Sequence, residues 1–259
     1  MDILGFRKIV EKSRADEVGD LLQRLRQAAQ PDMKVAEEYE MSFLTFSDCT
    51  VRAVPIESES NKKHPTGILY FELLNLVYCQ YRLLHDGYFL RGAVTIGDIC
   101  FDEDMVFGPA LVNAYALESQ FANCPRIVVD PVVFAAFDEE PLLRNKIHDV
   151  PTEREYLAAI VKRDSDGIYF VDYLRAILSE FDEEGQEFEF LALHKHRVLE
   201  RAEGFRALHK VAAKYLWLAT YHNDLIRDIG EKQFADRDYD IDDFLIAPNE
   251  MPLVYEMDW

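Results

Sequence analysis

Two aspartates follow short apolar runs of the kind that form buried strands. Asp48 ends the run Phe43-Leu-Thr-Phe-Ser-Asp48, and Asp98 ends the run Arg91-Gly-Ala-Val-Thr-Ile-Gly-Asp98. An apolar run that ends in a carboxylate is typical of a strand that delivers an acid to the edge of a sheet. Two such carboxylates on adjacent strands can hold divalent metal ions. The alternative for each is an ordinary polar residue in the turn after a strand.

The elements around these aspartates predict the order βαββαβ between residues 43 and 130. After the first strand come, in order, an apolar helix over 67–85, strands over 88–97 and 105–107, a helix over 110–121 and a strand over 126–130. This order predicts an α+β fold with the ferredoxin-like arrangement. In that arrangement the strand that starts at Phe43 lies beside the central hairpin, so we expect Asp48 and Asp98 to approach each other.

The domain organisation follows from the flanking segments. Apolar residues at helical spacing predict an N-terminal helix over 1–32, which is a packing element or a dimer contact. A catalytic-type domain over 33–178 and a C-terminal helical region over 179–259 complete the chain. Histidines in the C-terminal region, such as His194 and His196, are interpreted as structural or surface residues, because two residues apart they do not share a helical face.

Composition limits the classes of function. The net charge of −20 argues against nucleic-acid binding, although bound metal and a few local cations can still favour one small polyanionic substrate. The four cysteines show no paired spacing and indicate reduced thiols. No segment resembles a signal peptide or approaches the length of a membrane span. We therefore expect a cytoplasmic protein with no stable membrane insertion.

Three segments give the chain a family resemblance. Phe46-Ser-Asp48 resembles the start of a class III nucleotide cyclase domain, whose first strand ends in Phe-x-Asp. Arg91-Gly-Ala-Val-Thr-Ile-Gly97 is similar to the family's Arg-x-Gly-Ile-x-x-Gly strand. Phe107-Gly-Pro-Ala-Leu-Val-Asn-Ala-Tyr-Ala-Leu-Glu-Ser119 is similar to its Trp/Phe-Gly-x-x-Val-Asn-x-Ala-x-Arg-x-Glu-Ser segment. Within the class, the short domain and helical tail resemble the pyrimidine cyclases of the bacterial Pycsar antiphage defence system.

The chain also departs from the family pattern. An ungapped alignment places the family's transition-state Asn at Val112 and its Arg at Ala116, with Asn113 one position away. The family's Lys-x-x-Gly-Asp hairpin, which carries its second metal-binding Asp, is not visible between residues 50 and 90. Because Thr95-Ile-Gly-Asp98 resembles the end of that hairpin, the second metal ligand is assigned to Asp98.

The resemblance implies a site with two Mn²⁺ or Mg²⁺ ions. Asp48, Asp98 and the backbone carbonyl of Cys49 are the expected metal ligands, and the two aspartates are the expected catalytic residues. Main-chain amides over 50–52 are expected to cradle phosphates at a helix start. Arg52 and Arg91 are the candidates for the cation that offsets the charge on the leaving pyrophosphate, and a surface or fold-stabilising salt bridge is the alternative for each. The complete set of candidate substrate-binding residues is Phe46, Thr50, Val51, Arg52 and Arg91.

The expected activity is cyclisation of UTP to 3′,5′-cyclic UMP and pyrophosphate, with the product activating a separate cyclic-nucleotide-binding effector. The alternatives are cyclisation of CTP, then cyclisation of a purine nucleotide. Val112 and Ala116 also leave open a degenerate cyclase fold that serves as a nucleotide-sensing scaffold. The resemblance implies a homodimer whose head-to-tail active sites are built from both chains.

Overall fold

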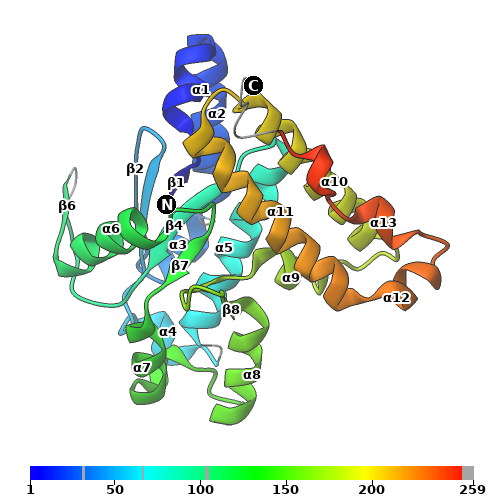
Figure 1. The fold of residues 1–259 in the computed structure, drawn as a ribbon. Helices are drawn as coiled ribbons and strands as arrows, with labels where there is room; N and C mark the ends of the chain where they lie inside the picture. The colour runs from blue at the N-terminus through cyan, green and yellow to red at the C-terminus, as the bar shows by residue number, and fades with distance from the viewer. Residues whose placement is uncertain (31–32, 66, 103–104, 253–259) are drawn as a thin grey trace. The chain divides into compact units, whose positions relative to one another are not determined.

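The computed structural model describes residues 1–30, 33–65, 67–102 and 105–252. Contacts divide the chain into two units. The first comprises Met1–Leu83 and Phe89–Ala176, and the second comprises Leu84–Tyr88 and Ile177–Trp259. The fold is a mixed α+β fold with a five-stranded sheet, small hairpins and a helical C-terminal region, as the sequence predicted (Figure 1).

The five-stranded sheet lies in the first unit and contains both parallel and antiparallel pairs. Its order is β1 (Asp2–Ile3), β4 (Leu90–Val94), β7 (Ile127–Val129), β9 (Tyr169–Val171) and β8 (Val161–Arg163). β4 and β7 run parallel, whereas β1 is antiparallel to β4 and β9 is antiparallel to both β7 and β8. β7 is buried along its whole length, as expected for a β-branched strand in the middle of a sheet.

Two hairpins accompany this sheet. β2 (Ser42–Phe46) and β3 (Cys49–Ala53) pair in a register that places Phe46 opposite Cys49, so the connecting turn contains only Ser47 and Asp48. Thr50 and Met1 exchange backbone hydrogen bonds of 2.8 and 2.9 Å, which attach β3 to the free side of β1. The second hairpin joins β5 (Cys100–Asp102) and β6 (Met105–Phe107).

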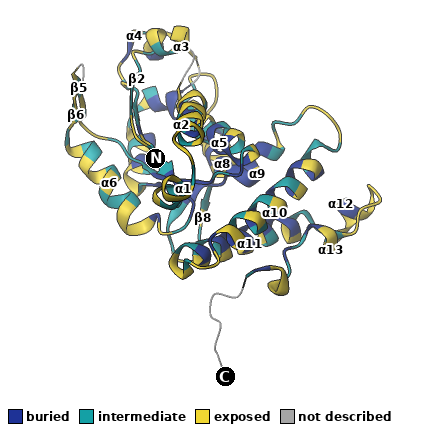
Figure 2. Cartoon of the chain, turned by 90° about the horizontal axis from the view of Figure 1, so that it is seen from above, coloured by how far each residue is buried: buried dark blue, intermediate teal, exposed yellow. Residues whose placement is uncertain are grey.

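Helices fill the remainder of the first unit. They include α5 (Ile68–His85), whose Leu73 and Val77 are fully buried, and α6 (Pro109–Phe121), which contacts β4 and β7. Figure 2 shows that α6 exposes much of its surface. The other elements are α1 (Phe6–Lys12), α2 (Ala15–Ala29), α3 (Met33–Glu38), α4 (Glu59–Lys63), α7 (Pro131–Glu139), η1 (Pro141–Leu143) and α8 (Val150–Ile160).

The second unit is helical. α10 (Gln186–Gly204) and α11 (His209–Ile229) pack side by side, and α13 (Ile241–Phe244) contacts both (Figure 1). The smaller elements are α12 (Glu231–Ala235) and η2 (Pro248–Glu250), while α9 (Tyr173–Leu178) spans the boundary between the units. Across the described part of the chain, no helix combines the length and apolar composition needed to cross a bilayer.

The predicted position of the first strand is wrong. The strand that starts at Phe43 was expected to neighbour the strand 88–97, but β4 is flanked by β1 and β7. The N-terminal segment, predicted as one helix, contributes β1 as well as α1 and α2. β1 has two residues, too few for any periodicity to distinguish it from the start of a helix. The βαββαβ order therefore begins with β1 and ends with β4.

Candidate metal and nucleotide site

Two aspartates lie near the point where β3 is hydrogen-bonded to the start of β1. Asp2 lies on β1, and Asp48 lies in the two-residue turn between β2 and β3. Ser47 adopts a left-handed φ of 55°, which tightens this turn. The backbone hydrogen bonds between Thr50 and Met1 fix the turn beside β1. Sequence analysis identified Asp48 as a site residue, and the structure pairs it with Asp2 rather than with the acid that was expected.

The charge of Asp2 acts on the Asp48 carboxylate. Burial, and then the negative charge of Asp2, raise the pKa of Asp48, and hydrogen bonds from the backbone of Asp48 and Ile3 and from the Ser47 hydroxyl only partly oppose this. Half-buried carboxylates that repel each other are hard-oxygen donors of the kind that divalent cations prefer. The donor set fits Mg²⁺ or Mn²⁺. Within the described residues, no group of three or more His, Cys, Asp or Glu side chains forms a larger metal site.

Arg91 is the cation beside this pair. It stands opposite Asp2 in the register of β1 and β4, and its Nε and Nη2 donate to the two carboxylate oxygens of Asp2 at 2.7 and 2.8 Å. Its Nη1 lies 3.0 Å from Oε1 of Glu118 on α6. Burial opposes the charge of the guanidinium, but Asp2, Glu118 and Asp48 outweigh burial and raise the pKa of Arg91. The group therefore stays charged.

Asp98 lies in the loop between β4 and β5. It is exposed and follows the far end of β4, and its carbonyl oxygen accepts a hydrogen bond from the backbone of Ala110 in the first turn of α6. Glu118, which contacts Arg91, is eight residues further along α6, a distance of about 12 Å along the helix axis. The structure therefore does not bring Asp98 to Asp48, because β4 and α6 separate the two positions.

The expected phosphate cradle after Asp48 is not a helix start. Thr50, Val51 and Arg52 belong to β3, and the backbone amide of Thr50 already donates to the carbonyl of Met1. The Arg52 guanidinium donates to Glu72 of α5 at 2.8 Å and to the carbonyl of Ala29 at 3.3 Å. Its side chain is only 12% exposed. Arg52 therefore connects β3 to α5 and α2, and its charge is directed away from any solvent-borne phosphate.

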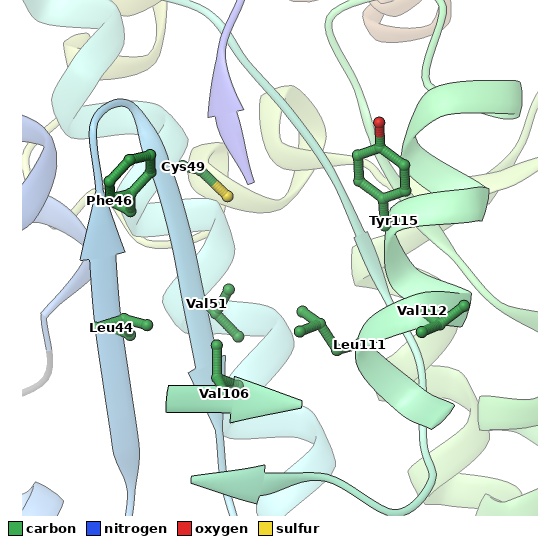
Figure 3. A pocket seen from close by; sticks show the side chains of 8 residues that line it. All are labelled: Leu44, Phe46, Cys49, Val51, Val106, Leu111, Val112 and Tyr115. Atoms are coloured by element: carbon green, nitrogen blue, oxygen red, sulfur yellow. The ribbon is translucent and has the colours of Figure 1, made fainter. Parts of the chain in front are cut away.

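Phe46 and Cys49 lie at the rim of an apolar groove of about 410 Å³. Figure 3 shows the β2–β3 hairpin on one side of the groove and α6 on the other, with Val106 of β6 between them. The complete lining is Leu44, Phe46, Cys49, Val51, Val106, Leu111, Val112 and Tyr115. No lining residue carries a formal charge. Phe46, Val112 and Tyr115 are 80%, 69% and 70% exposed, so large apolar side chains face solvent in the single chain.

The positions that differ from the cyclase pattern lie on α6. Val112 lines the groove, and Asn113 is directed to another partner. The Asn113 amide donates to Asp130 at 2.6 Å and to the Thr95 hydroxyl at 3.0 Å. Thr95 follows β4 and Asp130 follows β7, so this polar cluster lies at the carboxyl ends of the two parallel strands. Asn113 is thereby held away from the Asp2–Asp48 pair, which lies at the opposite end of β4.

Sequence reasoning missed Asp2 and assigned no role to Glu118. The signal for Asp2 was the run Asp2-Ile-Leu-Gly5, an acid and two aliphatic residues before a glycine. Gly5 has a φ of 76° and marks the turn from β1 into α1. No local signal identifies the partner of Glu118, because Arg91 is distant in sequence. Comparisons of the chain with models of known protein families, with characterised proteins and with solved structures find no match.

Proposed function

We propose that this chain is a Mn²⁺- or Mg²⁺-dependent pyrimidine nucleotide cyclase with the ferredoxin-like, palm-type arrangement of the class III cyclases. The observation that carries the proposal is the Asp2–Asp48 pair. In the cyclase pattern, one metal-binding Asp lies on the first strand and the second lies at the tip of the following hairpin. Asp2 on β1 and Asp48 in the β2–β3 turn match these two positions. Asp98 is withdrawn from the proposed metal site on the geometry given above.

Strand order supports the same proposal. From β1 to β4 the chain follows βαββαβ, with β3 beside β1 through Met1 and Thr50, and with β1 beside β4. The spatial order β2-β3-β1-β4 is the ferredoxin-like order. A Cβ on Gly92 would lie 2.9 Å from the Cα of Met1, so this close approach of β1 to β4 requires the glycine in the Arg91-Gly92 segment.

The chemistry assigns a role to each charged residue. When bound, divalent cations lower the pKa of the ribose 3′-hydroxyl and neutralise the triphosphate. Asp2 and Asp48 would hold these cations. The 3′-oxygen loses its proton to solvent and forms a bond to the α-phosphorus, while the bond from that phosphorus to the pyrophosphate oxygen breaks. Arg91 supplies a fixed positive charge beside the leaving pyrophosphate.

The apolar groove supports a homodimer. The β2–β3 hairpin that carries Asp48 also forms one wall of the groove, so a second chain bound there lies next to the metal-binding residues. The chain carries a net charge of −20, so an uncharged contact surface avoids adding close like-charge contacts to the repulsion between two copies. Exposed Phe46 and Tyr115 provide such a surface, rich in the aromatic residues that dominate interface energies. We accordingly propose that the second copy of this chain covers the groove.

Uracil is the proposed base, with cytosine as the alternative, because the chain lacks the residues with which purine cyclases read adenine or guanine. This choice rests on the resemblance to the Pycsar cyclases, as does the proposed role in antiphage defence through a cyclic-nucleotide-binding effector. Uracil and cytosine present opposite donor and acceptor groups at their 4-position, so one site favours one base.

One observation favours a second candidate, a nucleotide-sensing scaffold without turnover. Val112 and Ala116 occupy the positions of the family's transition-state Asn and Arg, and Asn113 is bonded to Asp130 and Thr95. A chain with these features binds nucleotide and metal through Asp2 and Asp48 but does not cyclise. Both candidates predict nucleotide binding, and only the cyclase predicts product, so a turnover assay separates them.

The test is an incubation of the full chain with Mn²⁺ and all four nucleoside triphosphates, with products resolved by mass. Cyclic UMP as the dominant product is expected, and dominant cyclic CMP, AMP or GMP would replace the base assignment. Asp2→Asn and Asp48→Asn should each abolish turnover, whereas the matched variant Asp98→Asn should retain most of it. An inactive Asp98→Asn beside an active Asp2→Asn would refute the proposed metal pair. Metal-dependent nucleotide binding without any product would favour the scaffold.

A further inference from the structure

Arg91 is hydrogen-bonded to the carboxylate of Asp2, which the proposed metal site also requires. Its Nε and Nη2 use both oxygens of Asp2, at 2.7 and 2.8 Å. Such a bidentate contact is among the strongest pairings of a guanidinium with a carboxylate. A divalent cation that binds Asp2 must therefore displace at least one of these two hydrogen bonds. Arg91 acts as the resident counter-ion of Asp2 in the absence of metal.

Glu118 pairs with Nη1 of Arg91, the guanidinium nitrogen that is not bonded to Asp2. Nη1 of Arg91 lies 3.0 Å from Oε1 of Glu118, and the two side chains are 28% and 16% exposed. Glu118 lies on α6 and Asp2 on β1, so the two carboxylates contact the guanidinium from different elements. When Asp2 is taken by a cation, the ion pair with Glu118 remains. Nε and Nη2 then become available to an anionic oxygen.

We propose that Glu118 is the positioning residue of Arg91, which exchanges Asp2 for the polyphosphate of the substrate when a divalent cation binds. Glu118 holds the guanidinium beside the site through this exchange. Without Glu118, a guanidinium displaced from Asp2 has no ion pair with α6. Displacement of Arg91 from Asp2 by a cation therefore becomes less favourable. This inference rests on the proposed Asp2–Asp48 metal site and adds to it the order in which the charges are exchanged.

The test measures Mn²⁺ affinity of the full chain without nucleotide, by electron paramagnetic resonance of free Mn²⁺. Four proteins form a double-mutant cycle: wild type, Arg91→Gln, Glu118→Gln and the double variant. Arg91→Gln should tighten Mn²⁺ binding by about tenfold, because a charge-assisted contact no longer competes for Asp2. Glu118→Gln should weaken binding several-fold in the wild-type background and have no effect in the Arg91→Gln background.

If the charge of Glu118 acts directly on the metal, Glu118→Gln should weaken Mn²⁺ binding equally in the wild-type and Arg91→Gln backgrounds. That result would overturn the proposal. Unchanged or weaker Mn²⁺ binding by Arg91→Gln would also overturn it. Arg7→Gln is the matched control, because Arg7 is 89% exposed and pairs with Glu11 on the surface. It removes the same charge without touching Asp2, and its Mn²⁺ affinity should equal that of wild type.

A measurement on the wild-type chain covers the case in which a variant does not fold. The NMR signal of the Arg91 Nε–H should shift when Mg²⁺ is added, since that group loses its hydrogen bond to Asp2. A signal that stays fixed while Mg²⁺ binds would refute the exchange. The metal site itself is tested separately by Asp2→Asn and Asp48→Asn. If neither variant alters Mn²⁺ affinity, the proposed function loses its metal site and the inference falls with it.

Discussion

Asp2 and Asp48 come from distant parts of the chain, and β3 holds the turn that contains Asp48 against the strand that contains Asp2. Burial of Asp48 and the charge of Asp2 together raise the pKa of Asp48. The pair is therefore a position at which the folded chain carries unfavourable negative charge. Such positions are more common at functional sites than elsewhere in proteins.

The first prediction concerns the stability of Asp48→Asn. An acid whose pKa is raised by folding binds more protons in the folded state, so its destabilising contribution grows as the pH rises above 3.8 and is complete above the folded pKa. Asp48→Asn removes this contribution. Without metal, the free energy of unfolding of the variant relative to wild type should therefore increase as the pH is raised from 3.5 to 7, as urea denaturation would measure.

At neutral pH, bound metal should reverse the relative stability of wild type and Asp48→Asn, so that wild type becomes the more stable. A cation that binds only the folded state stabilises it. Mn²⁺ is therefore expected to raise the melting temperature of wild type and to leave that of Asp48→Asn nearly unchanged. Asp98→Asn is the matched control, and its response to Mn²⁺ should equal that of wild type. A stability difference between Asp48→Asn and wild type that does not vary with pH would contradict the electrostatic interpretation.

The second prediction concerns the groove. Tyr115 is 70% exposed in the single chain and lines the groove with Val112 and Phe46. Tyr115→Asp would place a charge in an apolar interface, and we expect it to weaken dimerisation by at least about tenfold, since aromatic anchors at interfaces contribute about 2 kcal/mol or more. The measurement is sedimentation velocity over a range of concentrations, with turnover followed in parallel.

A second exposed apolar residue serves as the control. Ile147 is 73% exposed and is not part of the groove. Ile147→Asp adds the same charge and should leave the association state unchanged. Equal effects of both variants would indicate a general effect of charge on solubility. A monomeric wild-type chain with full turnover would exclude the homodimer.

The third prediction concerns Arg52, whose guanidinium is directed to Glu72 and to the carbonyl of Ala29. The two charged side chains are 12% and 22% exposed, so removing the cation leaves a largely buried carboxylate without this partner. Arg52→Gln should lower the free energy of unfolding by about 2 kcal/mol, the usual cost of losing a hydrogen bond to a charged group. Its Mn²⁺ affinity should stay within about twofold of wild type.

Chemical denaturation and Mn²⁺ titration of the same preparation separate stability from binding. Arg7→Gln is again the matched control, with an expected loss of stability near zero. If Arg52→Gln were as stable as wild type but bound nucleotide poorly, Arg52 would be a substrate ligand, as the sequence resemblance implied, and the ion pair with Glu72 would be incidental.

How far the sequence predicts the fold depends on the length of each element. α5 was predicted within a residue of its observed start, because its apolar residues extend over many helical turns. β1 was missed because two residues carry no periodicity, and its place in the sheet is determined by β4 and by the bonds between Met1 and Thr50. Because neither β1 nor β3 was predicted as a strand, the βαββαβ order was placed on β2, β4, β6 and β7, and Asp98 was assigned in place of Asp2.

Side-chain partners explain the remaining differences at the site. Arg52 was a candidate phosphate ligand because the sequence does not reveal Glu72 as its partner on α5. Arg91 was a candidate for the cation of the site, and that role stays a prediction. Its contact with Asp2 depends on the pairing of β1 with β4, and its contact with Glu118 depends on the packing of α6 against β4. Patterns within one segment can be predicted from the sequence, whereas ion pairs between distant segments depend on tertiary packing.

The fourth prediction concerns the buried pair His194 and His222 in the second unit. Their Nδ1 atoms are 3.1 Å apart, and Nε2 of His222 lies 2.9 Å from the carbonyl oxygen of Phe244. Because a carbonyl only accepts, Nε2 of His222 carries a proton, and Nδ1 of His222 then accepts from Nδ1–H of His194. Both rings are fully buried and stacked with their centroids 5.0 Å apart. This hydrogen-bond pattern requires the His222 imidazole to be neutral, because its Nδ1 must accept.

Acid should therefore destabilise the folded chain through this pair. Burial, and also the charge of Lys195, lower the pKa of His222 to about 4, although its bond to Phe244 opposes this, and burial lowers the pKa of His194 well below 6.5. A base with a lowered pKa binds fewer protons in the folded state, so its contribution to stability is complete above pH 6.5 and is lost as the pH falls toward 4. For His222 the loss is on the order of 3 kcal/mol.

The measurement is the melting temperature between pH 7.5 and 4.5 for wild type and for His222→Gln, whose amide nitrogen can still donate to the Phe244 carbonyl. We expect the variant to be less stable than wild type at pH 7.5 but to lose less stability on acidification, because one titrating imidazole is gone. His209→Gln, a histidine at the start of α11 outside this pair, is the control and should keep the wild-type slope. Equal slopes for His222→Gln and wild type would show that acid acts elsewhere, with the carboxylates of the first unit as the next groups to test.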